Sequence, residues 1–245
     1  MTIEVLVAPA KLTLSLRMVG IRDDGYHLVD AEMVALDLAD ELEVSSSAGA
    51  EGQLTIEDRT GGLSVSGGPE DLVTRALYLV GRTADVVVRK AIPAGAGLGG
   101  GSADAAAVLR WAGFTDVVAA AGIGADVSFC LVGGRARVSG IGEVVEPLPF
   151  RDQVFTLLTP TVGCPTPDVY RRWDEMGGPV GDHGNDLEPA AMDVMPELAE
   201  WRDALGDATG RRPRLAGSGS TWFVEGEYPG DGRRIVRTVP TTVPA

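Results

Sequence analysis

The feature of this sequence that most constrains its fold is a glycine cluster that leads directly into an alanine-rich run. Residues 93–107 read PAGAGLGGGSADAAA. Glycine permits positive φ and close backbone approach, whereas alanine has the highest helix propensity, so the segment predicts a loop followed by a helix. The first N–H groups of a helix lack internal acceptors and attract anions. We therefore predict a phosphate-binding loop, formed by Pro93, Gly95, Ala96, Gly97, Leu98, Gly99, Gly100, Gly101, Ser102 and Ala103.

Two familiar nucleotide-binding loops do not fit this segment. A Walker loop requires Gly-Lys-Ser/Thr at the helix start, and here Ser102 follows Gly101 without a lysine. Gly95, Gly97 and Gly100 satisfy G-x-G-x-x-G, but the segment lies mid-chain and no regular alternation of strands and helices follows. A flexible glycine hinge is the structural alternative, and the strong helix signal argues against it. Ser102 could cap the helix or donate its hydroxyl to a phosphate.

The composition restricts the classes of partner. The 245 residues include 35 acidic and 21 basic side chains, a formal charge of −14 that disfavours nucleic acids and anionic membranes. A nucleotide remains possible because backbone N–H groups can hold its phosphates. Cys130 and Cys164 have no metal-ligand spacing and predict neither a disulfide scaffold nor a metal site. The chain shows no signal-peptide pattern and no membrane-length apolar run, so we expect a cytoplasmic protein.

Periodicity predicts mixed α and β structure on both sides of a proline-containing joint near residue 150. Two apolar runs joined at Pro9 open the chain, and the second alternates as a half-buried strand. We predict further strands at 34–44, 85–90, 135–138, 143–145 and 154–158, and a strand meander through 54–56 and 63–65. Helices are predicted at 70–81, 116–121, 167–176 and 188–205, besides the one that follows the glycines.

Three ordered motifs resemble the GHMP kinase superfamily of small-molecule kinases. They are APAKLTL at 8–14, the glycine segment at 93–103, and LAGSGSTWF at 215–223. The resemblance implies an α+β, two-domain GHMP kinase fold. An N-terminal ATP-binding domain over residues 1–150 would be ribosomal protein S5 domain 2-like, and a C-terminal domain over 151–245 would be a ferredoxin-like α/β sandwich.

Within the superfamily, the chain most resembles the 4-diphosphocytidyl-2-C-methyl-D-erythritol kinases. The segments that point to this family are DGYH at 24–27, GADVSF at 124–129, CPTPDVY at 164–170 and NDLE at 185–188. The resemblance implies transfer of phosphate from ATP, as its Mg²⁺ complex, to the 2-hydroxyl of a small cytidyl sugar alcohol in non-mevalonate isoprenoid synthesis. No dedicated protein metal ligands are implied, and a monomer or a homodimer is expected.

The resemblance also assigns roles to single residues. Asp126 becomes the acceptor of the hydroxyl proton and Lys11 its cationic neighbour, where a solvated strand lysine and a helix cap are the bland alternatives. Tyr26 would stack on the cytosine, and His27 would use both ring nitrogens on the cytosine edge. A packed turn aromatic and a surface histidine are the alternatives there.

Three further residues, Gly217, Ser218 and Thr13, complete the predicted site. Gly217 and Ser218 would lie in a second glycine loop that faces the first, although an ordinary hairpin turn fits the same residues. Thr13 would bind substrate and stands where the family has asparagine. Asp71 stands where an asparagine commonly contacts adenine. We assign Asp186 a structural role, as the cap of the helix that follows it.

Three rival functions remain open on the sequence alone. Another GHMP kinase would share the phosphate loop but not the Tyr26–His27 pair. A non-catalytic paralogue would bind a cytidine nucleotide without phosphate transfer. A structural subunit would bind no nucleotide, which the intact glycine loop disfavours.

Overall fold

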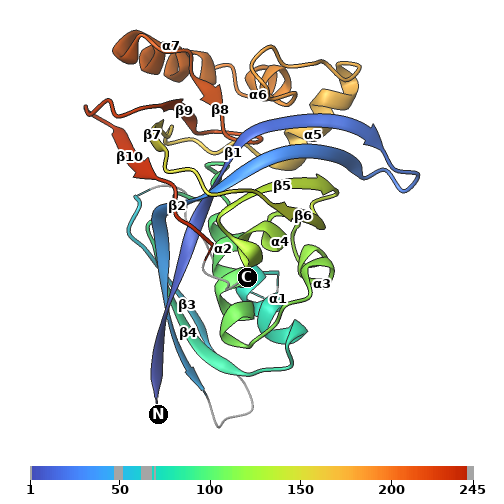
Figure 1. The fold of residues 1–245 in the computed structure, drawn as a ribbon, viewed down its shortest axis with the longest axis vertical. Helices are drawn as coiled ribbons and strands as arrows, with labels where there is room; N and C mark the ends of the chain where they lie inside the picture. The colour runs from blue at the N-terminus through green and yellow to red at the C-terminus, as the bar shows by residue number, and fades with distance from the viewer. Residues whose placement is uncertain (1, 47–51, 62–67, 69, 242–245) are drawn as a thin grey trace.

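The protein is built around a long antiparallel hairpin (Figure 1). The computed structural model describes residues 2–46, 52–61, 68 and 70–241. Strands β1 (Ile3–Ile21) and β2 (His27–Ser46) pair along almost their whole length. The two runs expected around Pro9 are one strand, with a register shift between Pro9 and Lys11. The hairpin turn closes where Gly25, at φ 87°, donates its N–H to the Arg22 carbonyl at 2.8 Å.

The hairpin belongs to a six-stranded sheet in the order β3-β4-β2-β5-β6, with β1 paired to β2. The other strands are β3 (Leu54–Asp58), β4 (Ala84–Lys90), β5 (Arg135–Gly140) and β6 (Val144–Pro147). Strand β2 pairs with β5 through its first part and with β4 through its last. The strand predicted at 54–56 is β3, which pairs in parallel with β4. The strand predicted at 63–65 lies outside the described residues, so the meander stays a prediction.

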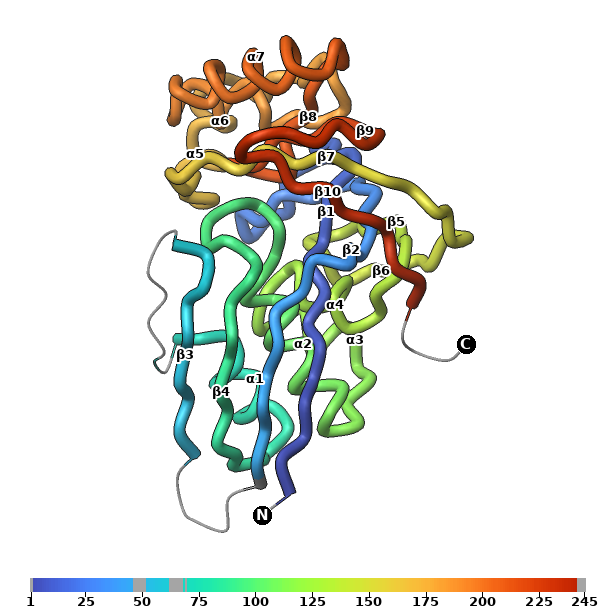
Figure 2. The backbone as a smooth tube through the Cα atoms, turned by 90° about the vertical axis from the view of Figure 1, so that its left-hand side faces the viewer, coloured from blue at the N-terminus to red at the C-terminus, as the bar shows by residue number. Residues whose placement is uncertain are grey.

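Four helices cover one face of this sheet (Figure 2). They are α1 (Leu72–Leu79), α2 (Gly100–Trp111), α3 (Val117–Ala121) and α4 (Ala125–Val132). Helix α2 is central, and its alanines at 103 and 105–107 are buried against neighbouring elements. Small side chains let a helix pack closely. The start of α2 is therefore held firmly against the sheet.

The second half of the chain builds a smaller antiparallel sheet in the order β10-β7-β9-β8. Its strands are β7 (Val154–Leu158), β8 (Arg214–Leu215), β9 (Trp222–Glu225) and β10 (Arg233–Arg237), the last of which was not predicted. Helices α5 (Thr166–Glu175), α6 (Glu188–Val194) and α7 (Leu198–Thr209) complete this half. The single helix predicted over 188–205 is wrong, because the chain breaks at Pro196 between α6 and α7.

The predicted division at residue 150 lies between β6 and β7. The partition into two domains stays a prediction.

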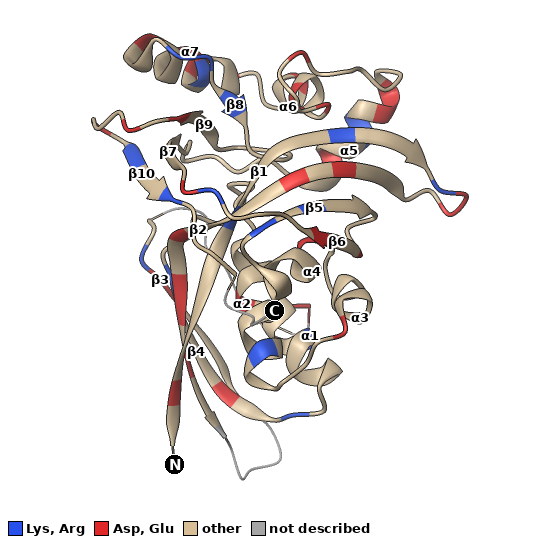
Figure 3. Cartoon of the chain, viewed as in Figure 1, with Lys and Arg blue, Asp and Glu red and all other residues tan. Residues whose placement is uncertain are grey.

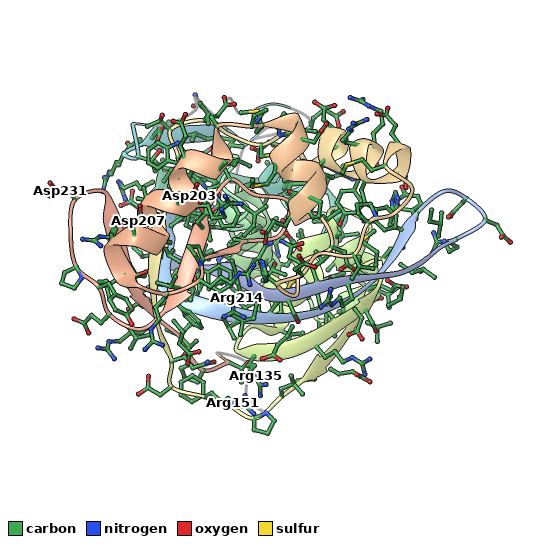
Figure 4. All side chains as sticks on the ribbon, turned by 90° about the horizontal axis from the view of Figure 1, so that it is seen from above. Arg135, Arg151, Asp203, Asp207, Arg214 and Asp231 are labelled. Carbon is green, nitrogen blue, oxygen red and sulfur yellow. The ribbon has the colours of Figure 1, made fainter. Side chains whose placement is uncertain are left out.

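Several contacts join the two halves of the chain. Beyond β10 the chain returns to the first sheet, where Val239 N–H donates to the Ala35 carbonyl at 2.9 Å. Arg214, labelled in Figure 4, donates to the Leu14 carbonyl at 3.2 Å, and its guanidinium lies 4.6 Å from the centre of the Phe223 ring.

The distribution of charge follows the acidic composition. Figure 3 shows acidic and basic positions interspersed over the strands and helices of both halves. Among the described residues, no helix has the length and apolar character required to cross a membrane.

Asp186 joins the two halves but does not cap a helix. The next helix, α6, begins at Glu188, and the Asp186 carboxylate instead turns toward β1. It accepts hydrogen bonds from Arg17 Nη1 at 2.6 Å, Met18 N at 2.9 Å and Gly181 N at 3.1 Å. The predicted cap is therefore wrong, because three donors in one place outcompete the start of a short helix.

We expect Asp186→Ala to lower the free energy of unfolding by about 2–4 kcal/mol, because a buried backbone donor, a half-buried one and a guanidinium lose their acceptor. Denaturant titration followed by circular dichroism measures the change. Asp182→Ala, at an exposed position nearby, is the control. Equal losses in both variants would contradict this role of Asp186.

Candidate active site

A cavity of about 850 Å³ lies between the two halves of the fold. The glycine segment, Lys11 and Asp126 line it from the first half, and Thr166, Tyr170, Gly217 and Ser218 line it from the second. Clefts between structural units are common ligand sites. Every residue predicted for the site contributes to this lining except Ala103, which is buried within α2.

The glycine loop has a shape that other residues cannot adopt without strain. Gly95, Gly97 and Gly99 have φ angles of 68°, 75° and 68°. A Cβ at Gly97 would lie 2.3 Å from the Ala216 carbonyl oxygen, and one at Gly99 would lie 2.7 Å from Cγ of Lys11. The glycines therefore allow both the left-handed backbone and a tight approach to Lys11.

Helix α2 begins at Gly100, and Gly100, Gly101 and Ser102 of its first turn line the cavity. Its N-cap is Gly99, which supplies no side-chain acceptor. Ser102 lies in the first turn and lines the cavity, so the expectation that it might cap the helix is wrong. The first N–H groups and the helix dipole favour an anion at this position. The glycines leave open the space that a Cβ would fill, and this space together with the backbone N–H groups suits phosphate oxygens.

The second glycine loop meets the first. Thr221 N–H donates to the Ala96 carbonyl at 3.1 Å, and the Asn185 side-chain amide donates to the carbonyls of Leu215 at 2.9 Å and Gly217 at 2.7 Å. Ser218 Oγ lies 2.8 Å from Thr166 Oγ1. In the sequence, Asn185 was notable only as part of the segment at 185–188, because its hydrogen-bond partners are distant along the chain.

Lys11 and Asp126 form an ion pair in the cavity. Lys11 Nζ lies 3.2 Å from Asp126 Oδ2 and donates to Thr13 Oγ1 at 3.0 Å. The Lys11 residue is 5% exposed, so the alternative of a solvated strand lysine is wrong. The Asp126 side chain is 33% exposed and lies in the first turn of α4, whose N-cap is Gly124. The Asp126 carboxylate can accept a proton from a bound hydroxyl, and the Lys11 ammonium beside it can stabilise an attacking oxygen.

Aromatic rings gather where the β1–β2 hairpin passes α5. Tyr26 is 59% exposed, whereas His27 packs with its ring centre 5.1 Å from that of Tyr170 and 5.7 Å from that of Trp173. His27 Nε2 lies 2.7 Å from Asp174 Oδ1. This bond occupies one of the two ring nitrogens that we expected to face a cytosine, so the structure leaves Nδ1 for such a contact.

Tyr170 was not among the residues predicted for the site, although it lines the cavity. Its place one helical turn along α5 was visible in the sequence, but the direction of its ring depends on the packing of α5 against the hairpin. Burial, with a smaller contribution from the charge of Asp126, raises the pKa of Tyr170 to about 12. The phenol therefore stays neutral at physiological pH.

Asp71, Lys90 and Asp104 also line the cavity. Asp71 caps α1, since its Oδ1 accepts the Val73 N–H at 2.8 Å. Lys90 and Asp104 were not predicted, because a single lysine on a strand and a single aspartate in a helix carry no pattern of their own. The two residues come together only in the folded protein, where the end of β4 meets α2.

Known proteins resemble this chain along most of its length. Residues 71–134 match the family model of the GHMP kinases N terminal domain. A 4-diphosphocytidyl-2-C-methyl-D-erythritol kinase of Paracoccus denitrificans (strain Pd 1222) is 38% identical over 237 residues, which cover 88% of this chain and 84% of the relative. The enzyme of that name from Ruegeria pomeroyi (strain ATCC 700808 / DSM 15171 / DSS-3) is 37% identical over 92% of this chain and 88% of its own.

Solved structures agree with these relatives. A crystal structure of 4-(cytidine 5'-diphospho)-2C-methyl-D-erythritol kinase superposes with a TM-score of 0.74 at 30% identity, covering 96% of this chain and 98% of that one. A homoserine kinase from Cytophaga hutchinsonii shares the fold, with a TM-score of 0.65 at 17% identity over 98% and 96% of the two chains. The α+β GHMP kinase fold expected from the sequence is confirmed. Given this fold, and relatives of 37–38% identity matched over most of their length, the chain belongs to the 4-diphosphocytidyl-2-C-methyl-D-erythritol kinase family.

Proposed function

We propose that this protein transfers the γ-phosphate of ATP to the 2-hydroxyl of 4-diphosphocytidyl-2-C-methyl-D-erythritol, a step of non-mevalonate isoprenoid synthesis. The observation that carries the proposal is the placement of the Lys11–Asp126 pair in the same cavity as the glycine loop and the start of α2. Phosphoryl transfer depends mainly on positioning and on charge stabilisation, and this cavity offers groups for both.

The glycine loop would hold the triphosphate. Backbone N–H groups between Gly95 and Gly101, with the first turn of α2, supply donors, and the Ser102 hydroxyl adds one more. Mg²⁺ would enter with ATP, bound mainly by the phosphates, and would neutralise charge that builds up on them. We place this reaction in the cytoplasm, where Mg·ATP is available.

Asp126 would act as the general base. As the acceptor hydroxyl oxygen forms its bond to the γ-phosphorus, its proton passes to the Asp126 carboxylate and the bond from the γ-phosphorus to the leaving ADP oxygen breaks. Lys11 stabilises the charge on the attacking oxygen, and its bond to Thr13 fixes the ammonium. Thr13 thus takes a supporting role where the family has asparagine.

The aromatic end of the cavity would bind the cytidine. Tyr26 offers an exposed ring, and Tyr170 lies beside His27 on the facing helix. A pyrimidine stacked on such rings gains about 1–3 kcal/mol per base. His27, oriented by Asp174, leaves Nδ1 for the base edge. These contacts distinguish the proposal from another GHMP kinase with a smaller acceptor.

Release of ADP from Mg·ATP in the presence of 4-diphosphocytidyl-2-C-methyl-D-erythritol tests the reaction, with phosphorus NMR of the product to locate the new phosphate. Homoserine and mevalonate in place of the cytidyl alcohol are the comparison acceptors. Faster turnover with either would favour another GHMP kinase. Calorimetric binding of the cytidyl alcohol without turnover would favour a non-catalytic paralogue.

We expect Asp126→Asn to lower kcat by about 10²–10⁴-fold, because the amide cannot accept the hydroxyl proton. The dissociation constant for Mg·ATP, measured by calorimetry, should stay within about threefold because the glycine loop is unchanged. Asp207→Asn, on α7 and outside the cavity, is the matched control and should keep full activity. Undiminished turnover of Asp126→Asn would show that the base is misassigned.

We expect Tyr26→Ala to raise the KM for the cytidyl substrate by roughly 5–100-fold through lost stacking. The KM for ATP should change little, because Tyr26 lies on the hairpin rather than on the phosphate loop. Steady-state kinetics with each substrate varied in turn gives both constants. Tyr78→Ala, at an 89% exposed position on α1, is the control. An equal rise in both KM values would contradict a role in cytidine binding.

A further inference from the structure

Three ionisable side chains meet in the core beneath the glycine loop. Lys90 from β4, Asp40 from β2 and Asp104 from α2 are 5%, 0% and 4% exposed. Lys90 Nζ donates both to Asp40 Oδ2 and to Asp104 Oδ2, the latter at 2.6 Å. Two carboxylates therefore share one ammonium at a site that is almost fully buried.

The two carboxylates differ in how well they are satisfied. Asp40 Oδ1 accepts the N–H groups of Ala91 at 2.5 Å and Ile92 at 2.8 Å, so both of its oxygens have partners. Asp104 Oδ1 is buried and has no hydrogen-bond partner among the described residues. An ionised carboxylate with an unpaired buried oxygen is costly, and protonation of that oxygen removes the charge.

This cluster lies directly under the proposed phosphate site. Asp104 is one turn along α2 from Gly100, and a Cβ at Gly100 would lie 3.1 Å from Lys90 Nζ. Lys90 and Asp104 both line the cavity that the glycine loop encloses. The charge of the cluster therefore acts on whatever the first turn of α2 binds.

We propose that Asp104, acting through Lys90, is a positioning residue for the nucleotide phosphates, and that phosphate binding is coupled to proton uptake by the Asp104 carboxyl group. The proposal rests on the nucleotide site proposed above. With Asp104 ionised, the cluster carries a net charge of minus one below an anion. With Asp104 protonated, the cluster is neutral and the Lys90 ammonium is still held in place by Asp40.

The direction of the coupling follows from the charges. Burial raises the pKa of Asp104 to about 7; Lys90 opposes this rise and the charge of Asp40 adds to it. A bound triphosphate raises this pKa further, because it repels the ionised form. The affinity for Mg·ATP is then highest below pH 7 and falls as pH rises through the pKa of the free protein. It levels off above the pKa of the complex.

Other ionisable groups lie on the elements packed against α2. Among the described residues they are Lys11 on β1, Asp126 and Cys130 on α4, Arg75 on α1 and Asp71 at its N-cap. Comparison with Asp104→Asn separates their contribution, because these groups are the same in both proteins. Burial raises the pKa of the Cys130 thiol to about 12, so Cys130 stays neutral. Because Asp126 belongs to the proposed catalytic pair, binding is measured without the acceptor substrate.

Calorimetric titration of the full chain with Mg·ATP between pH 6 and pH 9, in two buffers of different ionisation enthalpy, tests the proposal. We expect proton uptake near pH 7.5 and an affinity that falls by about tenfold for each unit by which the pKa rises on binding. Asp104→Asn mimics the protonated acid and should bind Mg·ATP without that uptake, with an affinity that varies little with pH. Protonation of the nucleotide itself is common to both proteins and cancels in the comparison.

Kinetics separate this role from a purely structural one. In Asp104→Asn the pH dependence of the KM for ATP should flatten, whereas the KM for the cytidyl substrate should keep its wild-type profile. If the variant does not fold, Asp104→Ser provides the same uncharged test. Equal proton uptake by wild-type and variant proteins would overturn the proposal. Wild-type protein that binds no Mg·ATP at any pH would instead overturn the proposed function itself.

Discussion

The close contact between two stretches of backbone is the constraint on which the rest of the site depends. The loop at Gly97 approaches the carbonyls of the second glycine loop so closely that a single methyl group would collide with them. Backbone hydrogen bonds from Thr221 and Lys11 to the first loop fix that approach from both sides. Because the contact is made by main chain, it holds the cavity without relying on flexible side chains.

This arrangement also explains how an acidic protein can bind a polyanion. The formal charge is −14, the two lysines at the cavity are each paired with aspartate, and Arg75 is a further cation in its lining. Oriented N–H groups and the helix dipole supply an attraction for phosphate that the net charge does not. Such a site attracts an anion only at short range, so selectivity depends on geometry more than on long-range steering.

Much of the fold and of the site could be predicted from the sequence, because the decisive signals were local. The glycine-to-alanine transition located the loop and α2, and the alternation of Leu12, Leu14 and Leu16 located β1. Contacts between distant segments were not predictable in this way. Asp186 resembles a helix cap in sequence, and only the docking of β1 beside it reveals two of its three donors. The Asp40–Lys90–Asp104 cluster likewise depends on three elements meeting in the core. Pro196 is a helix breaker, but the apolar residues on both sides of it follow a helical spacing that predicted one continuous helix.

The long strand β1 has a mechanical consequence. Its first part pairs with β2 at an edge of the larger sheet, where Ile3, Val5 and Val7 are exposed. Beyond Lys11 the same strand is held by the second half of the chain, where Leu16 N–H donates to the Gly184 carbonyl and Asp186 N–H to the Leu16 carbonyl. Lys11 thus lies on a strand that is hydrogen-bonded to other elements on both sides of it along the chain. Such a strand bends little at its middle, so the position of the lysine is fixed. Any acceptor alcohol must bring its hydroxyl to that position, and the residues at the ends of the cavity then select the substrate.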